Sequence, residues 1–317
     1  MTGYDARLMT IGEILDRAIA TYVRRFVPLF VILGIIAIPA GVLSALAGPS
    51  FTHVIQILGE LFSLPPGDTV DRTALLSQIN RSTLPGGSLQ FAQLLWLFAY
   101  PLAQTAIIVY AAGVFDGTAP TIASAYRVAV RRWLPQIVVA IAFLAIGAVL
   151  AFGFVIAVAL AVLAVSVLTF LSRVVGVIAV VIVALVAFVA AMVVAALGVI
   201  AWLMATISVA LDDGNPVRAI GRGLRRTLDR PLFRRTLGVA LAVVAISWFG
   251  DLAILAFAGL AEYLTHLTLL YGILAASAGV MLNGVTLVFV LLYVRDVQLR
   301  REGSDLMEAA AAPSPAL

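Results

Sequence analysis

Residues that could carry out catalysis or bind a metal are scarce in this chain, and they do not gather in the sequence. The 317 residues include no Cys and only two His, His53 and His266. No thiol nucleophile or thiolate metal site can therefore form, and the two His residues are too far apart for a metal-ligand run. Glu262 and His266 are four residues apart, and we interpret them as a solvated surface pair. The sequence predicts no catalytic residue, no metal site and no cofactor, so we expect a protein that is not an enzyme.

One acidic residue, Asp251, falls inside a predicted membrane span. Counted from Leu237, it lies about 21 Å along a helix that rises about 1.5 Å per residue, in the outer half of the membrane. An ionisable side chain at this depth is costly and is a functional candidate. Two interpretations stay open. Asp251 either pairs with Arg173 or is neutral, which is a structural role, or it takes part in proton or substrate movement.

All 20 basic residues are arginine. Arginine suits phosphate because its planar guanidinium binds two oxygens at once. The candidate contacts with anionic lipid headgroups or with a protein partner are Arg24, Arg25, Arg131, Arg132, Arg218, Arg222, Arg225 and Arg226. The alternative is that these arginines only set the membrane topology. The net charge of +4 does not indicate nucleic acid, since the arginines lie beside apolar segments.

The composition excludes a soluble domain. The chain is 63% apolar and 11% charged, with a mean hydropathy of +1.13, whereas soluble domains are about 45–50% apolar and about 25% charged. Several apolar stretches exceed the roughly 18–20 residues that cross a bilayer. We therefore predict an all-α, polytopic membrane protein, with a single integral membrane domain over residues 1–301.

Six membrane spans are predicted, at residues 26–46, 91–115, 134–171, 174–211, 237–260 and 268–294. The apolar stretch 134–211 is interrupted clearly only at Ser172-Arg173, and four shorter crossings in place of two would give eight spans. Their extra turns would fall near Gly153 and Gly198, where unsatisfied backbone groups in lipid would be expensive. We therefore favour two long helices.

The polar segments outside the spans include one long loop and one tail. Residues 47–90 are predicted to form a loop on the outer side, with a short surface helix over about 51–62 and a second over about 72–79. Residues 302–317 form a charged tail whose Ala/Pro/Ser-rich end is predicted to be disordered.

Three further polar segments are predicted to be basic amphipathic helices on the cytoplasmic membrane surface, at residues 10–25, 116–133 and 215–236. In the first, Thr10 and Glu13 match a capping box. In the third, Asn215 is the expected cap and Pro216 the first helical residue. The predicted apolar face of the first helix comprises Ile11, Leu15, Ala18, Tyr22 and Phe26, and that of the third Val217, Ile220, Leu224 and Leu228. These faces would enter the headgroup boundary while arginines contact the phosphates.

The arginine distribution predicts the orientation. Seventeen of the 20 arginines fall on one side of the predicted membrane, and the other side holds only Arg72, Arg81 and Arg173. The positive-inside rule then places both termini in the cytoplasm. The exclusive use of arginine together with abundant Ala and Val is typical of a GC-rich bacterial genome, so we expect the chain in a bacterial inner membrane.

A short motif occurs twice, as Arg24-Arg25-Phe26-Val27-Pro28 and as Arg131-Arg132-Trp133-Leu134-Pro135. Each copy leads from a basic helix into a membrane hairpin, and residues 215–236 form a looser third version. The chain is thus either built from three repeated units or has converged on this pattern where basic helices enter the membrane.

The residues also carry a family resemblance. The relevant segments are Ile11 to Ala18 with Tyr22, Arg24 and Arg25; Ala119 to Ile122 with Ala125-Tyr126-Arg127; Ala219, Arg222, Arg235 and Gly238; and Leu292-Tyr293, Asp296 and Arg300 to Leu306. Together they resemble bacterial proteins grouped with the membrane domain of glycerophosphoryl diester phosphodiesterase. Gly223 departs from this pattern, which usually has Ser there. The resemblance implies a six-span membrane protein without the separate catalytic domain of fused members.

These observations lead to one functional hypothesis and one rival. We expect a non-enzymatic membrane scaffold or accessory protein whose partners are anionic lipids and another membrane protein. The rival is a transporter or lipid-handling permease that uses the intramembrane Asp251.

Overall fold

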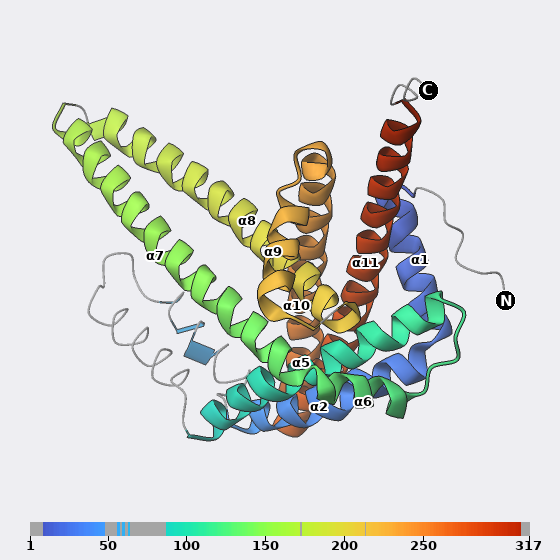
Figure 1. Ribbon diagram of the computed structural model, residues 1–317. Coiled ribbons are helices and arrows are strands. Elements are labelled where there is room, and N and C mark those ends of the chain that lie inside the picture. The colour runs from blue at the N-terminus through green and yellow to red at the C-terminus, as the bar shows by residue number, and fades with distance from the viewer. Residues whose placement is uncertain are drawn as a thin grey trace. The chain divides into compact units, whose positions relative to one another are not determined.

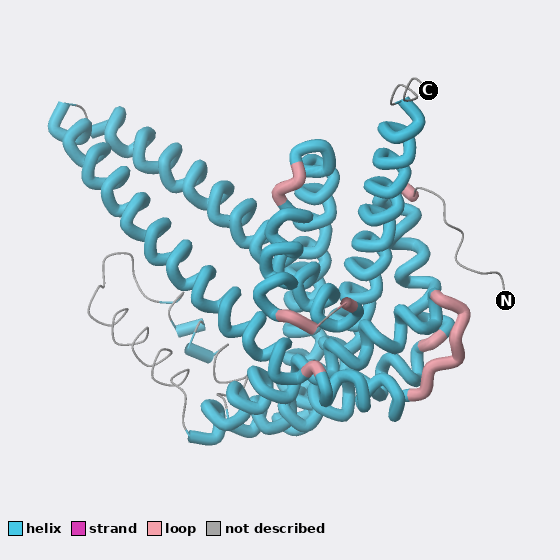
Figure 2. Tube along the Cα trace, viewed as in Figure 1, coloured by secondary structure: helices cyan, strands magenta, loops and turns pink. Residues whose placement is uncertain are grey.

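The computed structural model describes residues 9–47, 56–57, 59–60, 63, 87–171, 173–212 and 214–311. Within these ranges the chain forms helices joined by short loops and turns, and no strand is present (Figure 2). The prediction of an all-α protein is therefore confirmed. The predicted surface helices of residues 51–62 and 72–79, together with His53, Arg72 and Arg81, lie largely or wholly outside the described residues.

Among the residues that the structure describes, six helices are long and apolar enough to cross a membrane, as predicted (Figure 1). They are α2 (Phe26–Ala47), α5 (Gly87–Phe115), α7 (Trp133–Leu171), α8 (Arg173–Leu211), α10 (Phe233–Thr265) and α11 (Thr268–Ala311). The protein is a multi-pass membrane protein by the length and composition of these helices.

The apolar stretch 134–211 forms two continuous helices, α7 and α8, each of 39 residues. The helix continues through both Gly153 and Gly198, so the four shorter crossings are not formed and the favoured interpretation is confirmed. Each helix is roughly 58 Å long, about twice the thickness of a bilayer's hydrocarbon core. Most side chains of α7 from Leu144 to Leu163 are exposed, which is the arrangement expected of helices that face lipid.

Three short helices precede spans: α1 (Ile11–Arg24), α6 (Ile122–Arg131) and α9 (Pro216–Thr227). The Thr10–Glu13 capping box and the Asn215 cap both form as predicted. The second helix starts later than predicted, because Gly117 adopts a left-handed φ of 72° and the chain turns before Thr121 caps α6. After α9, a 3₁₀ turn η1 (Arg230–Leu232) leads into α10.

The chain divides into two compact units, one of residues 1–133 and 245–296, the other of residues 134–244 and 297–317. In the first unit, α2 and α11 cross closely at small residues. A Cβ placed on Gly41 would lie 2.5 Å from the Cβ of Ala276, and one on Gly272 would lie 2.8 Å from that of Ala45. Small residues four apart on both helices let the backbones approach, as in membrane helix pairs generally.

In the second unit, the start of α7, the end of α8 and α9 share a core. Val139, Ala205, Val209 and Ala219 are fully buried there, with Trp202 packed against them. Gln136 donates a hydrogen bond from Nε2 to the carbonyl oxygen of Thr206, at 2.9 Å. This buried polar contact fixes the register of α7 against α8.

Helix α11 continues beyond its predicted span to Ala311. The reason is local, since residues 298–311 are rich in Gln, Leu, Arg, Glu, Met and Ala, all good helix formers. The Ala/Pro/Ser-rich end that was predicted to be disordered begins at Ala309, and its residues up to Ala311 are helical instead. The rest of it, residues 312–317, lies outside the described residues.

Candidate functional site

Each of the three short helices buries residues spaced four apart, and in α6 and α9 these residues are small. The buried residues are Ile14, Ala18 and Tyr22 in α1, Ala125 and Ala129 in α6, and Ala219, Gly223 and Thr227 in α9. The apolar face predicted for α1 is partly covered by the chain: Ala18 and Tyr22 are buried, Ile11 and Leu15 are half-buried, and Phe26 is 37% exposed. Ile14, which lies beside this face, is buried as well. Small side chains allow a short helix to lie directly on its neighbours.

The two copies of the Arg-Arg-aromatic motif have the same local structure. Helix α1 ends at Arg24, Arg25 is its C-cap, and α2 begins at Phe26. Helix α6 likewise ends at Arg131, its C-cap is Arg132, and α7 begins at Trp133. The prolines that follow lie in the first turn of the next helix, where a backbone N–H is not needed. The motif therefore marks a one-residue break between a basic helix and a span.

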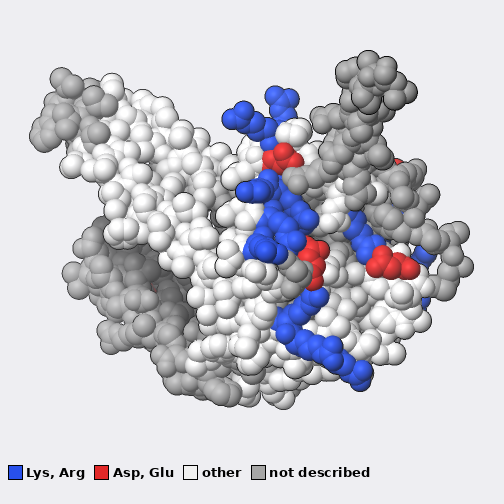
Figure 3. Space-filling view, in the orientation of Figure 1, with Lys and Arg blue, Asp and Glu red and all other residues white. Residues whose placement is uncertain are grey.

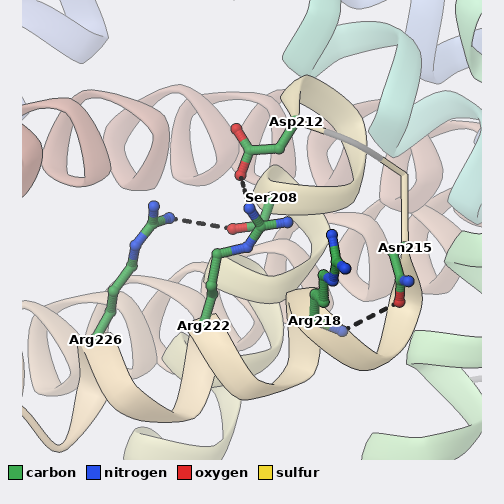
Figure 4. A network of polar contacts seen from close by, with 6 residues as sticks. All are labelled: Ser208, Asp212, Asn215, Arg218, Arg222 and Arg226. Atoms are coloured by element: carbon green, nitrogen blue, oxygen red, sulfur yellow. Dashed lines mark hydrogen bonds and ion pairs between the residues drawn. The ribbon is translucent and has the colours of Figure 1, made fainter.

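Two arginines of α9 are bound to the end of α8 (Figure 4). Arg222 forms an ion pair with Asp212 at 3.1 Å, and Arg226 donates a hydrogen bond to the hydroxyl of Ser208, also at 3.1 Å. The side chains of Arg222 and Asp212 are each only about a third exposed. The sequence analysis grouped these two arginines with the candidate lipid contacts. In the structure they hold α9 against the end of α8 instead.

Other arginines of the same helices are exposed. Of the predicted contacts, Arg24, Arg25, Arg131, Arg218 and Arg225 are exposed, whereas Arg132 is half-buried. Sequence reasoning did not single out three more that are exposed, Arg127, Arg230 and Arg234. The space-filling view shows basic side chains gathered over α9 and the start of α10 (Figure 3).

Exposed apolar side chains lie on the same three helices as the exposed arginines. Val23 of α1 is 66% exposed, Val130 of α6 is 63% exposed, and Val217 of α9 is 75% exposed. Leu228, the C-cap of α9, is 59% exposed. The predicted apolar face of α9 is therefore not the buried one, and Ala219, Gly223 and Thr227 pack on the chain instead.

The acidic candidates occupy two different settings. Asp251 is exposed on α10, between the exposed Phe249 and Leu252. The side chain of its predicted partner, Arg173, lies outside what the structure describes.

The interpretation of Glu262 as a solvated surface residue is wrong. Glu262 is only 1% exposed and accepts a hydrogen bond from the hydroxyl of Thr268, at 3.1 Å. The cause is the turn at His266, whose φ of 57° brings α11 back beside the end of α10. His266 itself is exposed.

Two adjacent residues of α11, missed as a pair in the sequence, join distant segments. Arg295 forms an ion pair with Asp116 at 2.8 Å, donates to the carbonyl oxygen of Ala112 at 3.3 Å, and lies over the ring of Phe115. Asp296 is fully buried and accepts a hydrogen bond from the backbone N–H of Met9, at 3.0 Å. These contacts attach the end of α5 and the start of α1 to α11. Asp296, one of the residues that carry the family resemblance, thus has a structural role.

Two tyrosines of the short helices are partly or wholly buried. The hydroxyl of Tyr126 donates to the carbonyl oxygen of Ile32 at 2.6 Å, and burial raises its pKa. The hydroxyl of Tyr22 packs against Gly284 and has no hydrogen-bond partner among the described residues. Burial raises the pKa of Tyr22 to about 12. Both groups are therefore neutral over the physiological range.

Comparisons with protein-family models, with curated proteins and with solved structures give no match for this chain. The family resemblance drawn from the sequence stays a prediction.

Proposed function

We propose that this protein is a non-enzymatic integral membrane scaffold or accessory protein, which binds the cytoplasmic leaflet of a bacterial inner membrane through α1, α6 and α9. One observation carries the proposal. On each of these helices, exposed arginines accompany apolar side chains that the chain leaves uncovered, such as Val23, Val130 and Val217. Helices that lie in the headgroup region have this combination, because lipid covers the apolar groups while the cations meet the phosphates.

The expected strength of binding follows from the charges. An arginine near an anionic membrane surface contributes about 1 kcal/mol, and this attraction weakens with salt. The exposed arginines Arg24, Arg25, Arg127, Arg131 and Arg225 sit on three separate helices, so their contributions fix the orientation of the protein at several points. The predicted arginine asymmetry supports the cytoplasmic side for all three.

The buried carboxylates support a non-catalytic role. Glu262 accepts from Thr268, and Asp296 accepts from the backbone of Met9. Both groups thus have structural hydrogen bonds, which accounts for their burial without a reaction.

Depth measurements test the membrane contact. The chain has no Cys, so Val217→Cys and Val130→Cys each place one environment-sensitive fluorophore on the reconstituted full chain. We expect a blue-shifted emission that brominated lipids quench. Ala119→Cys, in the exposed loop before α6, serves as the control and should stay water-like. Emission from positions 217 and 130 that matches position 119 would remove the basis of the proposal.

Labelling of cells tests the orientation. Arg127→Cys and Arg225→Cys should both resist an impermeant thiol reagent in intact cells and react in inside-out vesicles. Reaction of the two positions from opposite faces would contradict the arrangement.

Copurification tests the role as a scaffold. The full chain, isolated in a mild detergent, is expected to carry a second membrane protein in constant ratio. Repeated isolation as a lone monomer would count against this part of the proposal.

A further inference from the structure

The turn between α9 and α10 forms an open groove in one compact unit. It is lined by Leu224, Arg225, Leu228, Asp229, Arg230 and Pro231 and has a volume of about 750 Å³. Pockets that hold small ligands measure about 300–1,000 Å³. The groove therefore has room for a lipid headgroup and the beginning of its acyl chains.

The lining of this groove combines two kinds of chemistry. Arg225 from α9 and Arg230 from η1 are both exposed and make no hydrogen bond or ion pair with the residues that the structure describes. Leu228, 59% exposed, and the exposed Pro231 supply the apolar part. Two guanidinium groups beside uncovered apolar side chains match a phosphate attached to hydrocarbon.

From this lining we infer that the groove is a specific site for one anionic phospholipid, whose phosphodiester lies between Arg225 and Arg230 and whose acyl chains pass over Leu228. The inference rests on the proposed function, because it requires α9 to lie at the membrane surface.

The charges of the lining indicate which headgroup fits. Two cations, Arg225 and Arg230, line the groove together with one carboxylate, that of the half-buried Asp229. The excess of one positive charge favours a lipid with a single negative charge, such as phosphatidylglycerol. A doubly charged phosphomonoester would be repelled by Asp229, and the net-neutral phosphatidylethanolamine would leave the excess charge unmatched.

The remaining arginines of α9 explain why the groove differs from the basic surface as a whole. Arg222 and Arg226 point to the end of α8, where Asp212 and Ser208 bind them. These contacts fix α9 and hold the backbone that carries Arg225. The site is thus formed by two available guanidinium groups, that of Arg225 on α9 and that of Arg230 at the start of η1. Arg222 and Arg226 anchor α9 beside them.

Native mass spectrometry of the full chain tests the inference. The protein is titrated in detergent with phosphatidylglycerol or phosphatidylethanolamine, and retained lipids are counted. We expect one phosphatidylglycerol to be retained at concentrations where phosphatidylethanolamine is not. The double variant Arg225→Gln/Arg230→Gln should bind it at least tenfold more weakly, since a single charge-assisted contact is already worth about this much. Leu228→Asn should weaken retention while leaving both arginines in place.

A matched control removes the same charge elsewhere. Arg127→Gln/Arg131→Gln takes two exposed arginines from α6, outside the groove, and should keep the single retained lipid. An equal loss in both double variants would overturn the groove and leave diffuse attraction, with the proposed function intact. Equal retention of the two lipids by the unaltered chain would also overturn it, as would complete displacement of the lipid by inorganic phosphate. Failure of the proposed function is recognised separately, by water-like emission at positions 217 and 130.

Discussion

Replacing Gly223 by alanine is expected to force α9 away from α8. A Cβ on Gly223 would lie 2.6 Å from the carbonyl oxygen of Ala201, 3.0 Å from the Cβ of Ala205 and 3.1 Å from its backbone nitrogen. Ordinary contacts begin at 3.4 Å, so α9 would have to move by roughly 0.8 Å, because the backbone of α8 is close-packed and cannot yield like a flexible side chain.

The size of the effect follows from two opposing contributions. Overpacking of a tight contact destabilises by about 1–3 kcal/mol, and alanine in a helix is favoured over glycine by about 1 kcal/mol. Gly223→Ala should therefore lower the free energy of unfolding by about 0–2 kcal/mol. On the same helix, a Cβ on Gly221 would meet nothing within 4 Å. Gly221→Ala should thus raise stability by about 1 kcal/mol.

The difference between these two variants isolates the contact with α8. Unfolding of each full-length variant in mixed micelles, followed by circular dichroism, gives its free energy of unfolding. Amide hydrogen exchange measured at the residues of α9 reports on the stability of that helix by itself. We expect a difference of about 1–3 kcal/mol and faster exchange across α9 in Gly223→Ala only. Equal stability of the two variants would refute the close approach.

Three further predictions concern single side chains. Unfolded tyrosine ionises near pH 10, whereas burial raises the pKa of Tyr22 to about 12. The folded state should therefore lose up to about 2.7 kcal/mol as the pH rises from below 10 to above 12. Tyr22→Phe should reduce this loss in unfolding measurements at the two ends of this range, and an unchanged loss would contradict the burial of its hydroxyl. Asp296→Ala leaves the Met9 N–H without its acceptor and should lower the free energy of unfolding by about 1–3 kcal/mol. Hydrogen exchange at the start of α1 should become faster in this variant, and Asp296→Asn should lose less stability. Asp251→Leu should favour membrane insertion of α10 by about 3 kcal/mol in a translocation reporter; no gain would show that a partner already compensates the carboxylate.

The long helices and their caps could be predicted because the signals are local. A continuous apolar run long enough to cross a bilayer forms a helix there, because its backbone groups must bond to one another. This argument alone predicts α7 and α8. Thr10 with Glu13, and Asn215 before Pro216, predicted their helix starts correctly, because a cap depends on residues three positions apart.

The contacts between distant segments could not be predicted in the same way. Nothing near Arg295 in the sequence indicates that it forms an ion pair with Asp116. Glu262 was interpreted as a surface residue, because the sequence does not show that the turn at His266 places Thr268 beside it. These pairs depend on which helices become neighbours, and that information is spread over the packing of many small residues.

The candidate site illustrates a difficulty specific to membrane-surface helices. In a soluble protein the apolar face of a helix is normally the buried one, and on this basis Val217 and Leu228 should face the chain. In α9 the chain is packed against Ala219, Gly223 and Thr227 instead, whereas Val217 and Leu228 are exposed and Ile220 and Leu224 are half-buried. Under the proposed function such a helix has two apolar surroundings, protein and lipid. Its closest contact with α8 falls on small residues, because only they allow the close approach of the two backbones. The same distinction applies to α6, where Ala125 and Ala129 are buried while Val130 is exposed.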